Sequence, residues 1–234
     1  MLTSQIAECC KELRLSRNIA DMSCIVQEEN NQLYLLKLLK SELEHREITR
    51  TDRLIKNAGF YTLKVFEAFR FDEVTLPGAI TAESLKRLEF IDRKENLVLY
   101  GNVGTGKTHL SIALGIEACK KKLNVQFFRT SALVNKLAEA KKNGTLSVLM
   151  KKLSKADLLI FDEWGYVPLD RMGAQLLFEI VSECYERKPL IINTNIEFSR
   201  LSRIRDKRDY HEFYVITNYE AKRWRHHTFS PQNS

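Results

Sequence analysis

The sequence predicts an α/β protein with a central parallel β-sheet flanked by helices and a small all-helical region before it. From Thr81 onward, short apolar runs alternate with longer segments of helical periodicity, the order found in parallel sheets. A glycine-rich octapeptide at 101–108 joins one apolar run to a helical segment. Residues 1 to about 70 look helical and lack strand signals. We therefore expect a helical region over 1–70, a sheet-containing domain over 71–199 and a divergent basic segment over 200–234.

The expected elements follow from this alternation. Ser131 and Asp170 are typical N-cap residues for two of the helices. The run 213–217 is a candidate for an edge strand or a replacement fifth strand. The other strands are expected at 97–100, 125–128, 158–161 and 190–192, and helices at 82–90, 109–122, 131–142, 146–155 and 171–187.

The amino-terminal region is expected to hold three helices, over about 3–15, 29–47 and 50–58. Leucines recur at three- and four-residue spacing in the second of them, at 33, 36, 39 and 43. A basic patch follows, which is either a nucleic-acid-binding surface or a solvated helix face; its members are His45, Arg46, Arg50, Arg53 and Lys56. We expect the connector after it to anchor on the core through Phe60, Phe66, Phe69 and Phe71.

The composition is that of a globular protein. The 234 residues are 44% hydrophobic and 29% charged, and no apolar run approaches the roughly 20 residues of a membrane span. The amino terminus lacks the pattern of a signal peptide, and the five cysteines lack metal-ligand spacing, so we expect a cytoplasmic protein with reduced thiols. The net charge of +7 permits nucleic-acid binding without requiring it.

Residues 101–108 read Gly-Asn-Val-Gly-Thr-Gly-Lys-Thr, a complete Gly-x-x-x-x-Gly-Lys-Ser/Thr phosphate-binding loop in strand–loop–helix context. The alternative is an ordinary glycine-rich turn. Glycines leave backbone amides free to approach phosphate oxygens, and the next helix directs its positive end at the same anion. Lys107 is expected to reach the β- and γ-phosphates, and Thr108 to coordinate Mg²⁺. The predicted nucleotide-binding residues are Gly101, Asn102, Val103, Gly104, Thr105, Gly106, Lys107, Thr108 and His109.

A second polar cluster follows the apolar run 158–161. Asp162 and Glu163 stand at its end, where a parallel sheet delivers ligands to its carboxyl edge. Alone, such an acid pair is also typical of a solvated strand end. With the phosphate loop, it predicts that Asp162 holds the Mg²⁺ shell and that Glu163 is the catalytic base. The run 190–192 is likewise followed by Asn193, Thr194 and Asn195, which either contact the γ-phosphate or cap a turn.

With these motifs in place, the chain resembles the IstB-like ATP-binding family, the helper ATPases of an insertion-sequence transposition system, over roughly residues 4–199. This family is related to the DnaC and DnaI helicase loaders of the AAA+ class. Five segments carry the resemblance: LEHRE at 43–47, FIDRKENL at 90–97, GNVGTGKTHLSIALG at 101–115, DEWGYVPLD at 162–170 and NTNIEFS at 193–199.

The resemblance implies an AAA+ P-loop fold, ATP and Mg²⁺ as cofactors, and Asn195 as the polar sensor beside Lys107, Thr108, Asp162 and Glu163. It also implies homo-oligomers on ATP and DNA, and delivery of target DNA to a partner transposase. A replicative helicase loader is the alternative within the same chemistry.

One departure from the family pattern concerns the trans-acting arginine. The Asp-Arg-Leu segment that carries it is not recognisable in 200–234, where Arg203, Arg205 and Arg208 are the cations available. A chain without it would be a catalytically impaired nucleotide- or DNA-binding remnant, because such an arginine contributes about 10³–10⁵ in rate.

Overall fold

The computed structural model describes residues 2–78, 80–165, 171–184, 187–196 and 213–218. The chain divides into two compact units, 1–53 and 54–234. The division lies within a helix, earlier than the boundary near residue 70 expected above. The reason is packing, because Leu54, Ile55 and Ala58 already belong to the core of the second unit.

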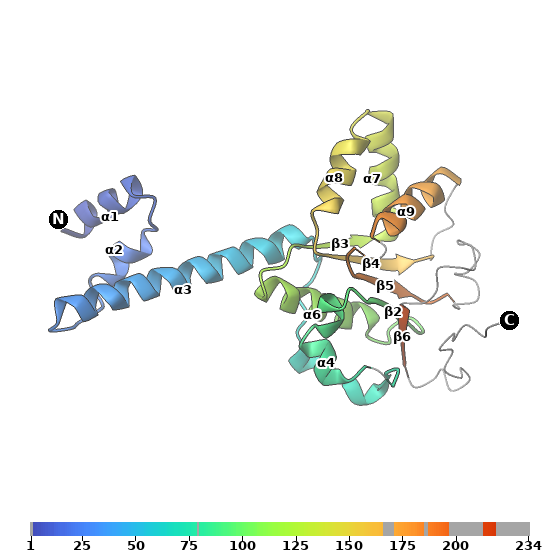
Figure 1. The fold of residues 1–234 in the computed structure, drawn as a ribbon, viewed down its shortest axis with the longest axis horizontal. Coiled ribbons are helices and arrows are strands. Elements are labelled where there is room, and N and C mark those ends of the chain that lie inside the picture. The colour runs from blue at the N-terminus through green and yellow to red at the C-terminus, as the bar shows by residue number, and fades with distance from the viewer. Residues whose placement is uncertain (1, 79, 166–170, 185–186, 197–212, 219–234) are drawn as a thin grey trace. The chain divides into compact units, whose positions relative to one another are not determined.

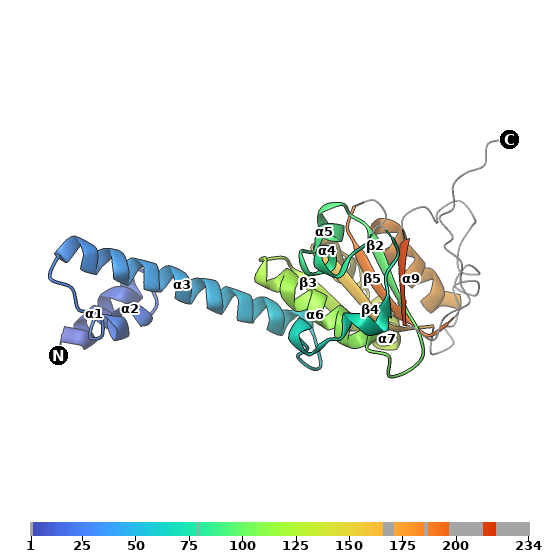
Figure 2. The same ribbon diagram turned by 90° about the horizontal axis from the view of Figure 1, so that it is seen from below.

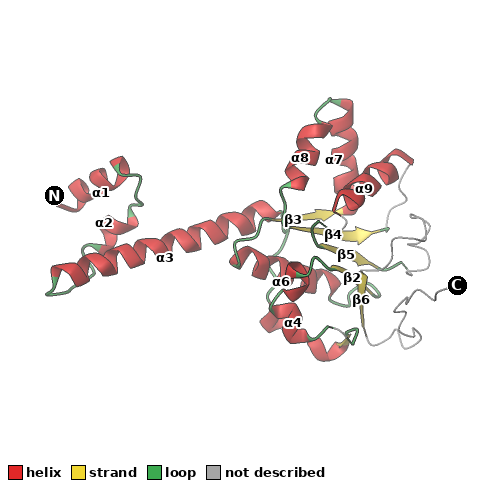
Figure 3. Ribbon diagram, in the orientation of Figure 1, coloured by secondary structure: helices red, strands yellow, loops and turns green. Residues whose placement is uncertain are grey.

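In the part that the structure describes, the first unit consists of helices joined by loops (Figure 3). It contains α1 (Leu2–Glu12), α2 (Asn18–Met22) and the larger part of α3 (Asn31–Ala58). The predicted break between two helices near residues 48–49 is wrong, since α3 is continuous. No proline or glycine occurs within α3 to interrupt it, and Gly59 follows its last residue with φ +85°.

The leucines at 33, 36, 39 and 43 do not form the buried face of α3. Leu36, Leu39 and Leu43 are 47%, 46% and 63% exposed, whereas Leu38 and Glu42 are buried. The covered face is the one that meets α2 and the residues on either side of it. There, Asn18 donates to the Ser41 carbonyl and Tyr34 donates to the Ser23 carbonyl.

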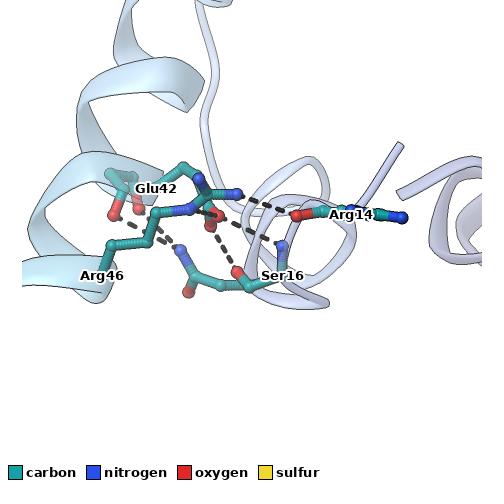
Figure 4. A network of polar contacts seen from close by, with 6 residues as sticks. Arg14, Ser16, Glu42 and Arg46 are labelled. Carbon is teal, nitrogen blue, oxygen red and sulfur yellow. Dashed lines mark hydrogen bonds and ion pairs between the residues drawn. The ribbon is translucent and has the colours of Figure 1, made fainter. Parts of the chain in front are cut away.

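A carboxylate, Glu42, organises this covered face (Figure 4). Its oxygens accept hydrogen bonds from the backbone amide of Ser16 at 3.1 Å, from the Ser16 hydroxyl, and from Arg46 Nε at 2.7 Å. Arg46 also donates to the Arg14 carbonyl at 3.0 Å. Burial raises the pKa of Glu42, but the hydrogen bonds from Ser16 and Arg46 outweigh it and hold the pKa below its ordinary value.

The second unit is built on a six-stranded sheet with strand order β1-β6-β2-β5-β4-β3. All neighbouring pairs are parallel except β1–β6. The candidate strand near 213–217 is present as β6 and pairs with both β1 and β2, so it lies inside the sheet. The bounds are β1 Val74–Thr75, β2 Asn96–Tyr100, β3 Val125–Arg129, β4 Leu158–Trp164, β5 Leu190–Thr194 and β6 Phe213–Asn218.

Helices cover both faces of this sheet (Figures 1 and 2). One face packs against α4 (Ala82–Lys86), α5 (Glu89–Asp92) and α6 (Lys107–Lys120), and the other against α7 (Thr130–Lys142), α8 (Leu146–Ser154) and α9 (Arg171–Cys184). The expected α/β fold and the positions of its helices are confirmed. The single helix expected over 82–90 is divided, because Leu88 has φ 61° and separates α4 from α5.

The prediction for the connector is confirmed, whereas the predicted cap at Ser131 is wrong. Phe66 is buried in the core of the α6 face, and Phe60, Phe69 and Phe71 pack against that core, so the connector does anchor on the domain. Ser131 is not an N-cap, since α7 begins at Thr130. Asp170 lies outside the described residues. No helix in the described part of the chain combines the length and apolarity needed to cross a bilayer.

We expect Glu42→Gln to loosen the first unit selectively. The neutral amide keeps the shape of the side chain but weakens charge-assisted hydrogen bonds, each worth about 1.5–3 kcal/mol. Because the folded-state pKa of Glu42 is depressed, its stabilisation is present above the ordinary value of 4.5 and is lost as the pH falls through the folded-state pKa. Amide hydrogen exchange in α1 and α2 measures both effects.

The matched control is Glu44→Gln, at an exposed position of the same helix. We expect it to leave exchange in α1 and α2 unchanged. Equal effects of the two substitutions, or unchanged exchange in Glu42→Gln, would show that the buried carboxylate does not organise this unit.

Candidate nucleotide and metal site

The sequence-predicted site residues meet at the carboxyl edge of the sheet. The phosphate loop follows β2, Asp162 and Glu163 lie near the end of β4, and Asn195 directly follows β5. Strands β2, β5 and β4 are neighbours and parallel, so their ends lie side by side. The alternation of strands and helices has therefore brought these segments to one place.

The loop adopts the backbone that its glycines permit. Gly104 and Gly106 both have φ +84°, a conformation that side chains disfavour. Gly106 precedes the first residue of α6, which directs its amino terminus toward the loop. A Cβ on Gly106 would lie 3.1 Å from the ring of Phe69, so the connector also contacts this turn.

Lys107 folds over the loop. Its Nζ donates to the carbonyl oxygens of Gly101 at 2.8 Å and Asn102 at 2.6 Å. Burial lowers the pKa of Lys107, while the negative charge of Asp162 opposes that shift. An ammonium group that lies on the phosphate loop and is partly withdrawn from water is well suited to bind phosphate.

The other predicted loop residues are more open. Val103 is 80% exposed at the loop tip, and the Thr105 hydroxyl donates to the Asn102 carbonyl at 2.8 Å. His109 Nε2 lies 2.8 Å from the Val65 carbonyl oxygen, which ties the first turn of α6 to the connector.

Asp162 is the most heavily hydrogen-bonded side chain of the site, although only 2% exposed. The Thr108 hydroxyl lies 3.1 Å from both of its carboxylate oxygens. Oδ1 also accepts from the backbone amide of Glu163 at 3.0 Å and from Asn193 Nδ2 at 2.9 Å. Oδ2 accepts from the Tyr61 hydroxyl at 3.4 Å. This donor set compensates for the loss of water around a buried carboxylate.

Glu163 differs from Asp162 in both exposure and backbone. Its side chain is exposed, and its φ is 56°, a left-handed value that is strained for a residue other than glycine. The pairing of β4 with β5 is irregular between Phe161 and Trp164, which is where this residue lies. The two consecutive acids point in different directions, as successive strand residues do, one into the protein and one toward solvent.

The asparagine that reaches Asp162 is Asn193, not Asn195. Asn193 is 1% exposed and donates through Nδ2 to Asp162 and to the Ser111 hydroxyl at 2.8 Å. Its Oδ1 is buried and has no hydrogen-bond partner among the residues that the structure describes. Asn195 is exposed beyond the end of β5, so its sensor role stays a prediction. The strand extends to Thr194, two residues further than expected, and so encloses Asn193.

Tyr61 and Arg129 are site residues that the sequence analysis did not single out. The Arg129 guanidinium lies 4.4 Å from the centre of the Tyr61 ring, and Arg129 pairs in register with Asp162. Burial and the negative charge of Asp162 raise the pKa of Tyr61. The only sequence signal was the aromatic run of the connector, in which Tyr61 follows Phe60.

The residues present fit a magnesium ion. Mg²⁺ prefers hard oxygen ligands and keeps several waters, and a Thr hydroxyl beside a carboxylate offers such oxygens next to a phosphate loop. Thr108 and Asp162 provide this pair. The arginines considered for a trans-acting role, Arg203, Arg205 and Arg208, lie outside the described residues.

A cavity of about 440 Å³ occupies the opposite edge of the sheet. Its lining includes Leu123, Asp157 and Pro189, which precede β3, β4 and β5. None of the sequence-predicted site residues lines it, so the chemistry of the carboxyl edge is independent of this cavity.

The family of the chain follows from comparison with known proteins. The IstB-like ATP binding protein family matches residues 10–208. The chain belongs to this family. The match extends past residue 199, where the recognised motifs end, and into the segment that was expected to diverge.

Relatives in this family are named for insertion sequences. A putative ATP-binding protein of IS5376 from Geobacillus stearothermophilus is 33% identical over 73% of this chain and 68% of its own length. The corresponding protein of IS232 from Bacillus thuringiensis subsp. berliner is 34% identical, over 72% and 69%. That of IS21 from Pseudomonas aeruginosa is 33% identical, over 74% and 65%. The chain thus shares its family with proteins named as ATP-binding proteins of insertion sequences.

Solved structures support the AAA+ P-loop fold. AMPPCP-bound DnaA from Aquifex aeolicus superposes with a TM-score of 0.51 at 25% identity, over 58% of this chain and 43% of that one. A replication initiator DnaA bound to AMPPCP and single-stranded DNA gives a TM-score of 0.54 at 23% identity, over 66% and 49%. This chain therefore spans less than half of each of these proteins.

We expect Glu163→Gly to be more stable than Glu163→Ala, although both remove the carboxylate. Glycine relieves the strain of a positive φ and alanine keeps it, a difference of about 1 kcal/mol after the entropy of glycine is included. For a protein of this size that free energy corresponds to about 2–4 °C in Tm. Thermal unfolding measures it.

The matched control compares Glu139→Gly with Glu139→Ala, at an exposed position within α7. Here the glycine variant should be the less stable of the two, because glycine destabilises a helix interior relative to alanine by up to about 1 kcal/mol. If Glu163→Gly unfolded at a lower temperature than Glu163→Ala, the left-handed backbone at this position would be refuted.

Proposed function

We propose that the protein is a Mg²⁺-dependent ATPase that binds DNA and assists the transposase of an insertion sequence. The observation that carries the proposal is the distance of 3.1 Å from the Thr108 hydroxyl to both oxygens of Asp162, beside the Lys107 ammonium group. A phosphate loop and a strand-end acid that meet in this way form the two halves of a metal–nucleotide site.

Each residue has a role set by its position. The backbone amides of Gly104 to Lys107 and the amino terminus of α6 bind phosphate oxygens. Lys107 exchanges its carbonyl partners for the β- and γ-phosphates, with which its positive charge interacts more strongly. Thr108 and Asp162 hold Mg²⁺, which when bound neutralises charge on the β- and γ-phosphates.

Glu163 is the proposed catalytic base. Its carboxylate is exposed at the same edge of the sheet, while Asp162 is buried and committed to its own donors. A solvent-facing carboxylate there can orient a water and accept its proton, whereas the buried one cannot leave its donors. Asn195, exposed beyond β5, is the proposed sensor of the γ-phosphate.

The partners follow from the family rather than from the site. The relatives are proteins of insertion sequences, which supports a transposase of the same element as partner. The net charge of +7 supports binding to DNA, which then weakens as salt increases. Homo-oligomers formed on ATP and DNA complete the proposal. Co-purification with a transposase, rather than with a hexameric helicase, separates it from the helicase-loader alternative.

We expect Lys107→Ala and Glu163→Gln to separate nucleotide binding from hydrolysis. Lys107→Ala removes the cation that faces the phosphates and should abolish Mg²⁺-dependent ATP binding. Glu163→Gln leaves the phosphate loop and metal ligands intact, so ATP affinity should stay within about twofold of wild type, while turnover should fall by about 10²–10⁴-fold. Equilibrium binding of a fluorescent ATP analogue and steady-state phosphate release, with DNA and at rising protein concentration, measure the two effects.

Two outcomes would contradict this assignment. ATP binding that survives Lys107→Ala would overturn the phosphate site. Wild-type protein that binds ATP but shows no turnover at any protein or DNA concentration would instead support a non-catalytic remnant, which the unrecognised arginine segment allows.

A further inference from the structure

We propose that Tyr61 is a positioning residue of the metal site, which holds the second oxygen of Asp162 from the connector that follows α3. The inference deepens the proposed function and rests on it, because Asp162 must act on a metal–nucleotide complex for its orientation to matter. No motif of the phosphate loop or of the acid pair contains Tyr61.

The backbone around Tyr61 is fixed by its neighbours. Gly59 ends α3 with φ +85°, and a Cβ there would lie 3.3 Å from the Phe127 carbonyl oxygen. Phe60 fills the space above Gly115, where a Cβ would come within 2.7 Å of its ring. Phe60 and Tyr61 both contact the Phe127 ring edge-on, with centroids 5.7 Å apart. The main chain of Tyr61 therefore has little freedom to move away from β3 and β4.

Two contacts orient the side chain of Tyr61. The guanidinium of Arg129 lies over its ring at 4.4 Å, within the range of a cation–π interaction, and Phe127 contacts the ring edge-on. The ring is thereby held so that its hydroxyl points to Asp162 Oδ2 at 3.4 Å.

The two oxygens of Asp162 are unequally supplied with donors. Oδ1 accepts from Asn193 and from the Glu163 amide, both at 3.0 Å or less. Among the contacts that the structure describes, Oδ2 has as donors only the Tyr61 hydroxyl and the Thr108 hydroxyl, which lies equally close to Oδ1. A hydroxyl carries one hydrogen, so Thr108 can donate to only one oxygen at a time. Tyr61 is thus a second donor to Oδ2 beside Thr108, and its hydroxyl also interacts with the Thr108 side chain.

The test is Tyr61→Phe, which removes the hydroxyl and keeps the ring that packs on Phe127 and Arg129. Affinity for a fluorescent ATP analogue is measured with Mg²⁺ and with EDTA, and the ratio of the two affinities reports the metal site rather than the whole pocket. Because partners that orient metal ligands typically contribute 10–100-fold to metal affinity, and this contact is long, we expect the ratio to fall by about tenfold. Affinity in EDTA should stay unchanged.

The matched control is Tyr34→Phe, which likewise removes one hydroxyl donor, to the Ser23 carbonyl of the first unit. It should leave both affinities unchanged. A ratio within twofold of wild type in Tyr61→Phe would overturn the inference, as would an equal loss with and without Mg²⁺, which indicates a structural role. If the wild-type protein bound the ATP analogue equally well with Mg²⁺ and with EDTA, the proposed function itself would be overturned.

Discussion

The site depends on holding one buried carboxylate, Asp162, in a fixed orientation. Asp162 is almost withdrawn from water, and a carboxylate in that position is stable only with a full set of donors. Those donors come from four separate segments of the chain: the connector, α6, β4 and β5. Through these hydrogen bonds, Asp162 connects the phosphate loop to the rest of the domain. The proposed chemistry requires this connection, because the loop and the acid must act on the same metal–nucleotide complex.

The fold explains how such distant segments meet. A parallel sheet places the ends of β2, β4 and β5 at one edge, where Lys107, Glu163 and Asn193 come together. The alternation of side chains along β4 then separates two adjacent acids, since Asp162 faces its donors and Glu163 faces solvent. The connector contributes from outside the sheet, through Phe69 against the loop and Tyr61 against Asp162.

The sequence predicted the parts of the site that motifs specify and missed those that packing decides. The phosphate loop and the acid pair follow from glycine positions and an apolar strand, which are local patterns. Asn193 was not separable from Asn195, because the choice depends on where β5 ends and not on the type of residue. Tyr61 had no signal of its own, since its role arises from a contact with β4 far away in sequence. The continuity of α3 was missed for a related reason: spacing of apolar residues marks a helix but does not fix its end.

A double-mutant cycle between Thr108 and Asp162 tests the central claim most directly. Thr108→Ala, Asp162→Asn and the double variant are compared by their Mg²⁺-dependent affinity for an ATP analogue. If both side chains act on one metal–nucleotide complex, the second substitution should lower the Mg²⁺-dependent affinity much less than the first. The affinity of the double variant should then be at least about tenfold higher than the product of the two single losses predicts. If the losses of affinity in the two single variants simply multiply in the double variant, Thr108 and Asp162 serve separate sites. That result would contradict a shared metal–nucleotide site in this protein.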